Sequence, residues 1–337
     1  MFIRFIIWLA HSVSPEKRHR GLNYALIFSP IFLLFFFLAG YSYFQIHQGL
    51  TELTLARRQS VAVPVTIALK EKLDHMVDLG VSFSIHPSIR GAITNGAWKD
   101  AKEILQIFKG VVDEPFVDRI FLTDPDGTLM VGIPETGTEG QNFSHRDWYQ
   151  GILNTSKPYV SGVYRRAVVP QYNVMAVAIP IPNEKGLLMA IMVLQVKLDN
   201  FLEWSKQIDV GPKGFVYIVD QKGNIAAHPK YPSQGEIIDF SSVPTVKSVI
   251  QGRRGVEITY NQIEKEERLV AYEPVPTYGW GIIVQQPTES AFASRDSTLQ
   301  VFLQIYVLIF LIVILLVAFI FRILVHYQDH HDIVRSK

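Results

Sequence analysis

Two stretches of the chain are free of charged residues and largely apolar. The first covers residues 22–46 (LNYALIFSPIFLLFFFLAGYSYFQI) and the second covers residues 297–321 (STLQVFLQIYVLIFLIVILLVAFIF). Each is longer than the ~20 residues with which an α-helix crosses the ~30 Å hydrocarbon core of a bilayer. A buried helix of a soluble protein rarely stays apolar on every face for this length. The pattern therefore predicts two transmembrane helices, with the lipid bilayer as a partner.

Basic residues lie on the outer side of both apolar stretches. They are Arg4, Lys17, Arg18 and Arg20 before the first stretch, and Arg322, Arg335 and Lys337 after the second. Short basic flanks stay in the cytoplasm, whereas a long loop is translocated whatever its charge. Arg57 and Arg58 weigh against this orientation but are outnumbered. We expect a two-pass protein of the bacterial inner membrane with a cytoplasmic N-terminus (1–21), a cytoplasmic tail (322–337) and a periplasmic or extracellular region between the spans.

The N-terminal end has two further features. The first apolar stretch is too long for the core of a cleaved signal peptide, so we expect it to remain as an anchor. The opening segment, residues 1–10, is too short to span a bilayer, and we expect it to lie along the inner membrane surface.

The region between the spans begins with helical periodicity and then changes to strand periodicity. Apolar residues at helical spacing predict a long stalk helix over 47–80 and another helix over 99–111. Alternating and continuous apolar runs then predict strands at 117–122, 128–133, 158–168, 172–180 and 187–198, followed by a helix around 200–208. The run at 187–198 is almost entirely apolar, so we expect it to be central in its sheet.

The strand pattern then starts again. A strand at 214–219, the turn Asp220-Gln221-Lys222-Gly223 and a strand at 224–228 repeat the earlier order of strand, Asp124-Pro125-Asp126-Gly127 turn and strand. Further strands fit 256–260, 267–273 and 279–286. The predicted fold class is α+β: two transmembrane helices flank a long N-terminal helix and two tandem antiparallel-sheet modules, membrane-distal at 81–208 and membrane-proximal at 209–296.

Charge and composition exclude several classes of protein. The chain has 32 basic and 31 acidic residues, a net charge of +1 and no Cys. It is therefore not a strongly basic nucleic-acid binder, and it has no disulfide, thiolate metal site or cysteine nucleophile. Phosphate-binding loops, dinucleotide fingerprints and the HExxH motif are absent from the sequence. We expect no cofactor, no metal, no nucleic-acid partner and no enzymatic activity.

The densest polar and aromatic cluster is Ser144-His145-Arg146-Asp147-Trp148-Tyr149, followed by Tyr159 and Tyr164. Aromatic walls with a guanidinium that can grip a carboxylate form a pocket for a small anionic ligand. In the alternative interpretation, Trp148 and Tyr149 pack a loop onto the sheet and Arg146 pairs with Asp147. Arg165 and Arg166 either add positive charge to the site or face solvent, and solvent is expected for at least one of them.

These residues carry a resemblance to a known family. The chain resembles the double Cache extracytoplasmic sensor domain of bacterial chemoreceptors, sensor histidine kinases and diguanylate cyclases. The resemblance rests on two spans around a long helix and two PAS-like modules, and on the motif Arg146-x-Trp148-Tyr149. The resemblance implies a homodimer and a ligand site in the distal module. There Arg146 and Trp148 would contact a carboxylate, while Tyr149 and Tyr164 would line the pocket.

Two positions depart from the amino-acid-binding branch of that family. A Tyr expected five residues before Arg146 is Gln141, and an Asp expected to bind the ligand's ammonium group on the central strand is Gln195. A neutral amide does not neutralise an ammonium group. The resemblance therefore implies a carboxylate, a hydroxy acid or another polar metabolite in place of an ordinary α-amino acid.

Three functions remain open from the sequence. The first is a sensor for a small polar ligand. Because residues 322–337 are too short for a kinase or cyclase, it would signal to a separate cytoplasmic or membrane partner, or be a truncated or split receptor. The second is an accessory membrane protein whose outer region binds another protein. The third is an anchored hydrolase that uses Ser144 and His145 beside Asp147, although no nucleophile elbow surrounds Ser144.

Overall fold

The computed structural model describes residues 15–111 and 116–335. The chain divides into two compact units: residues up to 53 together with those from 292 onward, and residues 54–291. The opening segment 1–10, which we expected on the membrane surface, lies outside the described residues. So do the flanking Arg4 and Lys337.

Long helices dominate the first unit. Helix α2 (Pro15–Ser84) and helix α8 (Thr288–Arg335) each contain an apolar window long enough to cross a membrane, and neither window is buried against other protein. Their aromatic side chains meet within this unit, where the rings of Phe35 and Phe310 stack with centroids 5.7 Å apart. The expected span at 22–46 and stalk helix at 47–80 form one continuous helix, because no break in the helical pattern separates them.

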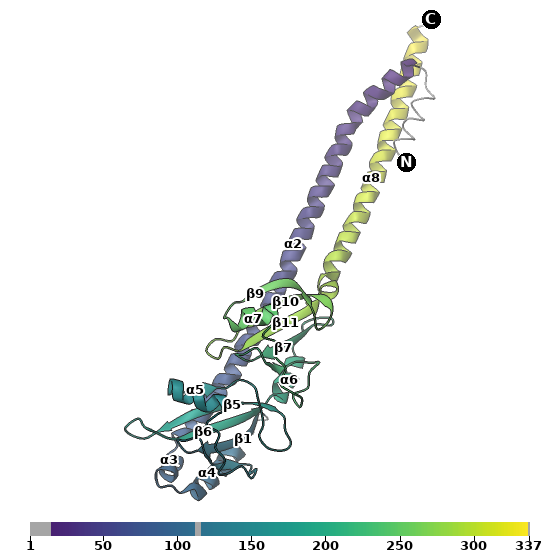
Figure 1. Cartoon of the computed structure of the whole chain (residues 1–337). Helices are drawn as coiled ribbons and strands as arrows, with labels where there is room; N and C mark the ends of the chain where they lie inside the picture. Colours follow the sequence, from purple (N-terminus) through teal and green to yellow (C-terminus); the bar gives the residue numbers. More distant parts are fainter. Residues whose placement is uncertain (1–14, 112–115, 336–337) are drawn as a thin grey trace. The chain divides into compact units, whose positions relative to one another are not determined.

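The second unit contains two antiparallel sheets that follow one another along the C-terminal half of α2 (Figure 1). The first module comprises α3 (Pro87–Thr94), α4 (Trp98–Val111), β1 (Val117–Thr123), β2 (Leu129–Ile133), α5 (Asp147–Thr155), β3 (Tyr159–Val160), β4 (Tyr164–Arg165), β5 (Asn173–Pro182), β6 (Leu188–Lys197) and α6 (Asp199–Lys206). Its strand order is β2-β1-β6-β5-β3, with β4 also paired to β5. The expected central position of the 187–198 strand is confirmed.

The second module repeats this plan. It comprises β7 (Phe215–Val219), β8 (Ile225–Ala227), α7 (Pro244–Ile250), β9 (Gly255–Asn261), β10 (Glu266–Pro274) and β11 (Gly281–Pro287), in the sheet order β8-β7-β11-β10-β9. The registers correspond: Arg119 of β1 lies opposite Gln195 of β6, and Phe215 of β7 lies opposite Gln285 of β11. The predicted repeat of two antiparallel modules is therefore confirmed.

Alternation along the strands gives each sheet two different faces. Leu69 and Leu73 of α2 are fully buried in one cluster with Ile120 of β1, Leu194 of β6 and Ile218 of β7, so α2 packs against both sheets. On the opposite face of the first sheet, a separate apolar cluster is covered by α5. The candidate site lies on that opposite face.

One expected strand is wrong in extent. Instead of a strand over 158–168, the structure has the two-residue strands β3 and β4. The backbone N–H groups between them donate to side chains: Gly162 to Asp147 Oδ2 at 2.9 Å and Val163 to Asp220 Oδ2 at 2.8 Å. Because these carboxylates take the donors that a sheet neighbour would need, the strand is interrupted.

Candidate ligand-binding site

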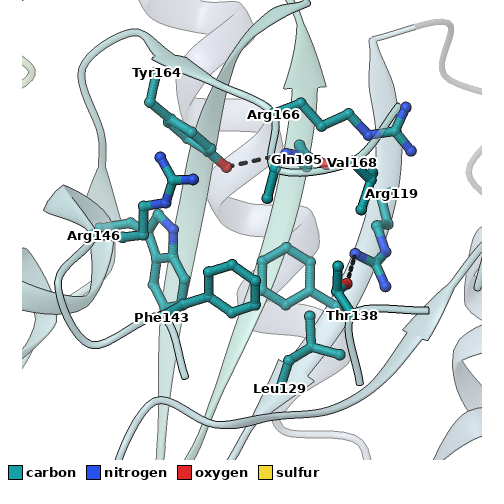
Figure 2. A pocket seen from close by; sticks show the side chains of 12 residues that line it. Arg119, Leu129, Thr138, Phe143, Arg146, Tyr164, Arg166, Val168 and Gln195 are labelled. Carbon is teal, nitrogen blue, oxygen red and sulfur yellow. Dashed lines mark hydrogen bonds between the residues drawn. The ribbon is translucent and has the colours of Figure 1, made fainter. Parts of the chain in front are cut away.

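A cavity opens on the α5 face of the first sheet, between the strands, the N-terminus of α5 and the segment that carries β4 (Figure 2). It encloses about 350 Å³ between its lining atoms, counting its open mouth. The lining residues are Arg119, Phe121, Leu129, Thr138, Phe143, Arg146, Trp148, Tyr164, Arg166, Ala167, Val168 and Gln195.

Arg146 stands at one side of this cavity. It is the N-cap residue of α5, in an extended conformation, and its guanidinium carbon lies 5.0 Å from the centre of the Tyr164 ring. Among the described residues it has no ion pair or hydrogen bond with another side chain. Asp147 instead lies 3.1 Å from Lys222 Nζ of the second module and accepts the Gly162 N–H. The alternative in which Arg146 pairs with Asp147 is therefore wrong, and the guanidinium is available to a ligand.

The two aromatic residues of the motif have different positions. Trp148 is only 1% exposed, contacts Phe121 edge to face at 5.8 Å and lines the cavity. Tyr149 lies outside the lining, and its hydroxyl donates to the Pro125 carbonyl at 2.9 Å. This hydrogen bond joins α5 to the β1–β2 turn, where Gly127 adopts a positive φ of 85° beside the Tyr149 ring. Tyr149 therefore packs the loop onto the sheet, as in the alternative interpretation of the sequence, whereas Trp148 lines the pocket.

Tyr164 and Gln195 supply neutral hydrogen-bonding groups to the cavity. Gln195 Nε2 donates to the Tyr164 hydroxyl at 3.3 Å (Figure 2). Burial raises the pKa of Tyr164 to about 12, so this hydroxyl stays protonated at physiological pH. Gln141 is exposed and lies outside the lining, and its backbone bonds to Thr138 and Leu129 of the neighbouring loop and strand.

Two further arginines line the cavity: Arg119, which the sequence motif did not indicate, and Arg166, for which the sequence left solvent exposure open. Arg119 is 4% exposed; it donates to Thr138 Oγ1 at 3.2 Å and lies 3.1 Å from Glu139 Oε1. The alternation of β1 would have placed it on the cavity face, because it is two residues from Phe121. Arg166 is also buried and lines the cavity, whereas Arg165 faces solvent. The expectation that at least one of this pair faces solvent is confirmed.

The other chemistry considered for this cluster lacks supporting geometry. The Ser144 hydroxyl lies 2.6 Å from Asn142 Oδ1, and no hydrogen bond joins it to His145 among the described residues. Within residues 15–111 and 116–335, no group of three His, Asp or Glu side chains is placed to hold a metal ion. Asp124 and Asp126 act as turn residues: Asp124 Oδ1 accepts the N–H groups of Asp126 and Thr128.

Comparison with known proteins decides the family. The Cache domain model dCache_1 matches residues 45–295, which is most of the chain and all of both sheets. The chain belongs to the Cache domain family. Its long N-terminal helix and two antiparallel sheets are those of a double Cache sensor domain, and both α2 and α8 contain a stretch long and apolar enough to cross a membrane.

The curated relatives of the chain include a chemotaxis protein. The methyl-accepting chemotaxis protein McpA of Bacillus subtilis is 26% identical over 124 residues, which cover 36% of this chain and 18% of McpA. This chain thus matches less than a fifth of that relative's length.

Two solved structures share the fold. The ligand-binding domain of the Pseudomonas fluorescens chemoreceptor CtaA, in complex with L-isoleucine, has a TM-score of 0.57 and 14% identity, covering 73% of this chain and 98% of that one. The periplasmic sensory domain of the Campylobacter jejuni chemoreceptor Tlp1 has a TM-score of 0.56 and 13% identity, covering 72% and 98%. At these identities the likeness concerns the fold alone.

Proposed function

We propose that this protein is a membrane-anchored sensor whose first Cache module binds a small carboxylate-bearing ligand, with Arg146 as its anchor. The observation that carries the proposal is the Arg146 guanidinium at one side of a cavity with aromatic walls, 5.0 Å from the Tyr164 ring and without an ion pair among the described residues. A bidentate guanidinium–carboxylate pair would complete its hydrogen bonding. The proposed role is binding, without catalysis.

The ligand site is connected to the second module through short polar contacts. Asp147, next to Arg146 in sequence, lies 3.1 Å from Lys222 of the second module. The segment that carries Tyr164 is held by Asp220, also of the second module, through the Val163 N–H. A ligand that draws Arg146 and Tyr164 together would displace the neighbouring residues Asp147 and Val163, and so would change their contacts with Lys222 and Asp220. We therefore place the response to the ligand at the boundary between the modules.

From there the signal would pass to the apolar helices. The first module is built on α2, and β11 of the second module ends at Pro287, directly before α8. In this proposal, both helices cross the bacterial inner membrane with both termini cytoplasmic. The protein forms a homodimer, and its signalling partner is reached on the cytoplasmic side. The basic residues that flank the two apolar stretches support this orientation.

The test is a ligand screen on the full chain in lipid nanodiscs, read by thermal unfolding. The library should contain carboxylates, hydroxy acids, amino acids, amines and purines. A binder at 100 times its Kd raises stability by about 2.7 kcal/mol. We expect a carboxylate-bearing hit that Arg146→Ala abolishes.

Arg165→Ala is the matched control, because Arg165 is a nearby arginine that faces solvent. A hit retained in Arg146→Ala would disprove the assigned site. A screen without any hit would favour the accessory protein that binds a macromolecular partner.

A further inference from the structure

The charges around the cavity define the ligand more narrowly than its family does. We infer that the ligand carries two acid groups and no ammonium group, as a short dicarboxylate does; this inference rests on the proposed function of the same site. It depends on three features: an excess of guanidinium groups, the absence of a carboxylate from the described lining, and the placement of the cations on different sides of the cavity.

The lining carries three cationic side chains, Arg119, Arg146 and Arg166, and no Asp or Glu among the described residues. Their neighbours neutralise them only in part. Glu139 lies 3.1 Å from Arg119, so that arginine has its own counter-ion. Arg146 has none among the residues that the structure describes.

Arg166 shares its counter-ion. Asp118 lies 3.8 Å from Arg166 Nη1 but only 3.3 Å from Lys197 Nζ, so one carboxylate serves two cations. Within the described residues, two carboxylates thus lie beside the three arginines of the lining, and one of the two is shared with Lys197, a partly exposed residue outside the lining. The lining therefore keeps an excess of positive charge, which acid groups of a ligand would compensate.

The cations lie on different sides of the cavity (Figure 2). Arg146 stands beside Tyr164 on one side, while Arg119 lies on the other, where it bonds to Thr138. Within the described residues, Arg166 Nε is buried without a hydrogen-bond partner, while its Nη1 donates to the Tyr172 hydroxyl. A ligand with acid groups at both ends could pair with Arg146 at one end and approach Arg119 and Arg166 with the other. A monocarboxylate would reach one of these sides only.

An ammonium group would find no anionic partner among the described residues of this lining. The hydrogen-bonding groups between the arginines are neutral: the Gln195 amide, the Thr138 hydroxyl and the Tyr164 hydroxyl, whose pKa is raised by burial. Placing a further cation among guanidinium groups, without a carboxylate to receive it, adds repulsion to the cost of desolvation. Amino acids are therefore disfavoured even when they have two carboxylates.

The experiment is isothermal titration calorimetry of the full chain in nanodiscs with two matched series. Each series contains a dicarboxylate, the same skeleton with an added ammonium group, and the same skeleton without the second carboxylate: succinate, aspartate and butyrate, then glutarate, glutamate and valerate. We expect at least one dicarboxylate to bind about tenfold or more tightly than both of its counterparts, because each difference removes or opposes a charged hydrogen bond.

Aspartate or glutamate binding as tightly as its dicarboxylate would overturn the inference. So would a monocarboxylate that equals its dicarboxylate. If only monocarboxylates or amino acids bind, and Arg146→Ala abolishes their binding, the inference fails while the proposed function stands. If nothing binds in a way that depends on Arg146, both fail.

A second variant tests the charge argument without touching an arginine. Gln195→Glu adds one negative charge to the cavity, on the strand residue opposite Arg119. We expect it to weaken dicarboxylate binding about tenfold or more and to shift the ratio of affinities toward the ammonium-bearing ligand. An unchanged ratio in a variant that melts like the parent would contradict the inference. Arg165→Ala should leave every affinity unchanged.

Discussion

The contact between the two modules can be tested at one buried carboxylate. Asp220 is completely buried in the β7–β8 turn of the second module. Its Oδ1 accepts the backbone N–H groups of Lys222 and Asn224, at 2.8 and 2.9 Å. Its Oδ2 accepts the Asn224 side-chain amide at 3.0 Å and the Val163 N–H of the first module at 2.8 Å. All four of these groups are donors.

Asp220→Asn removes half of this arrangement. If the Asn carbonyl oxygen takes the place of Oδ1, the new NH₂ group faces the two donors that now bond to Oδ2. If the amide is reversed, the NH₂ group faces the backbone N–H groups of Lys222 and Asn224. A hydrogen bond to a charged group contributes about 1.5–3 kcal/mol. Loss of two such bonds should lower the free energy of unfolding by about 3–6 kcal/mol. Each kcal/mol lowers Tm by about 2–4 °C for a domain of this size.

The internal repeat supplies a matched control for this variant. Asp124 occupies the equivalent turn of the first module, is only half-buried, and uses Oδ1 for its bonds to the Asp126 and Thr128 N–H groups. An Asn carbonyl can replace that oxygen, so Asp124→Asn should cost less than about 1 kcal/mol.

Thermal unfolding of both full-chain variants in nanodiscs measures the difference in stability. Hydrogen exchange at the Val163 amide then shows whether the module contact has opened in Asp220→Asn. Equal Tm values for the two variants, or an unchanged exchange rate at Val163, would refute the reasoning.

Three further predictions concern stability. Burial, with Lys230 and Arg268 nearby, lowers the pKa of His228 to about 3. The unfolded chain therefore takes up a proton below about pH 6.5, and urea unfolding should show a loss of about 2 kcal/mol between pH 8 and pH 5 that is absent in His228→Asn. In Gly151→Ala the added Cβ would lie 2.4 Å from the Tyr159 ring, so calorimetry should show a loss of about 1–3 kcal/mol. Gly91→Ala places its Cβ in open space within α3 and should raise stability by about 0.5–1 kcal/mol; a lower Tm would contradict this.

Local patterns in the sequence were sufficient for most of the fold. The β1–β2 and β7–β8 hairpins follow from alternation around turns in which an Asp side chain accepts backbone N–H groups two and four residues ahead. The central position of β6 follows from its continuous apolar run. Both signals lie within a few residues of the elements that they define.

The features that were missed depend on distant residues. The interrupted strand at 158–168 reflects the bond from Val163 to Asp220, 57 residues away in sequence. The sequence alone likewise does not show whether Arg166 lines the cavity or faces solvent, because this depends on the pairing of its segment with β5. Arg119 is the exception, because its place on the face of β1 that carries Phe121 could have been read from alternation.

The most direct test of the central claim is an experimental structure of the protein with the tightest ligand from the screen. We predict that the ligand lies in the first module between Arg146 and Gln195, with a carboxylate on the Arg146 guanidinium and an aromatic wall formed by Trp148 and Tyr164. A ligand found in the second module, or one in the first module that leaves Arg146 unpaired, would disprove the assigned site.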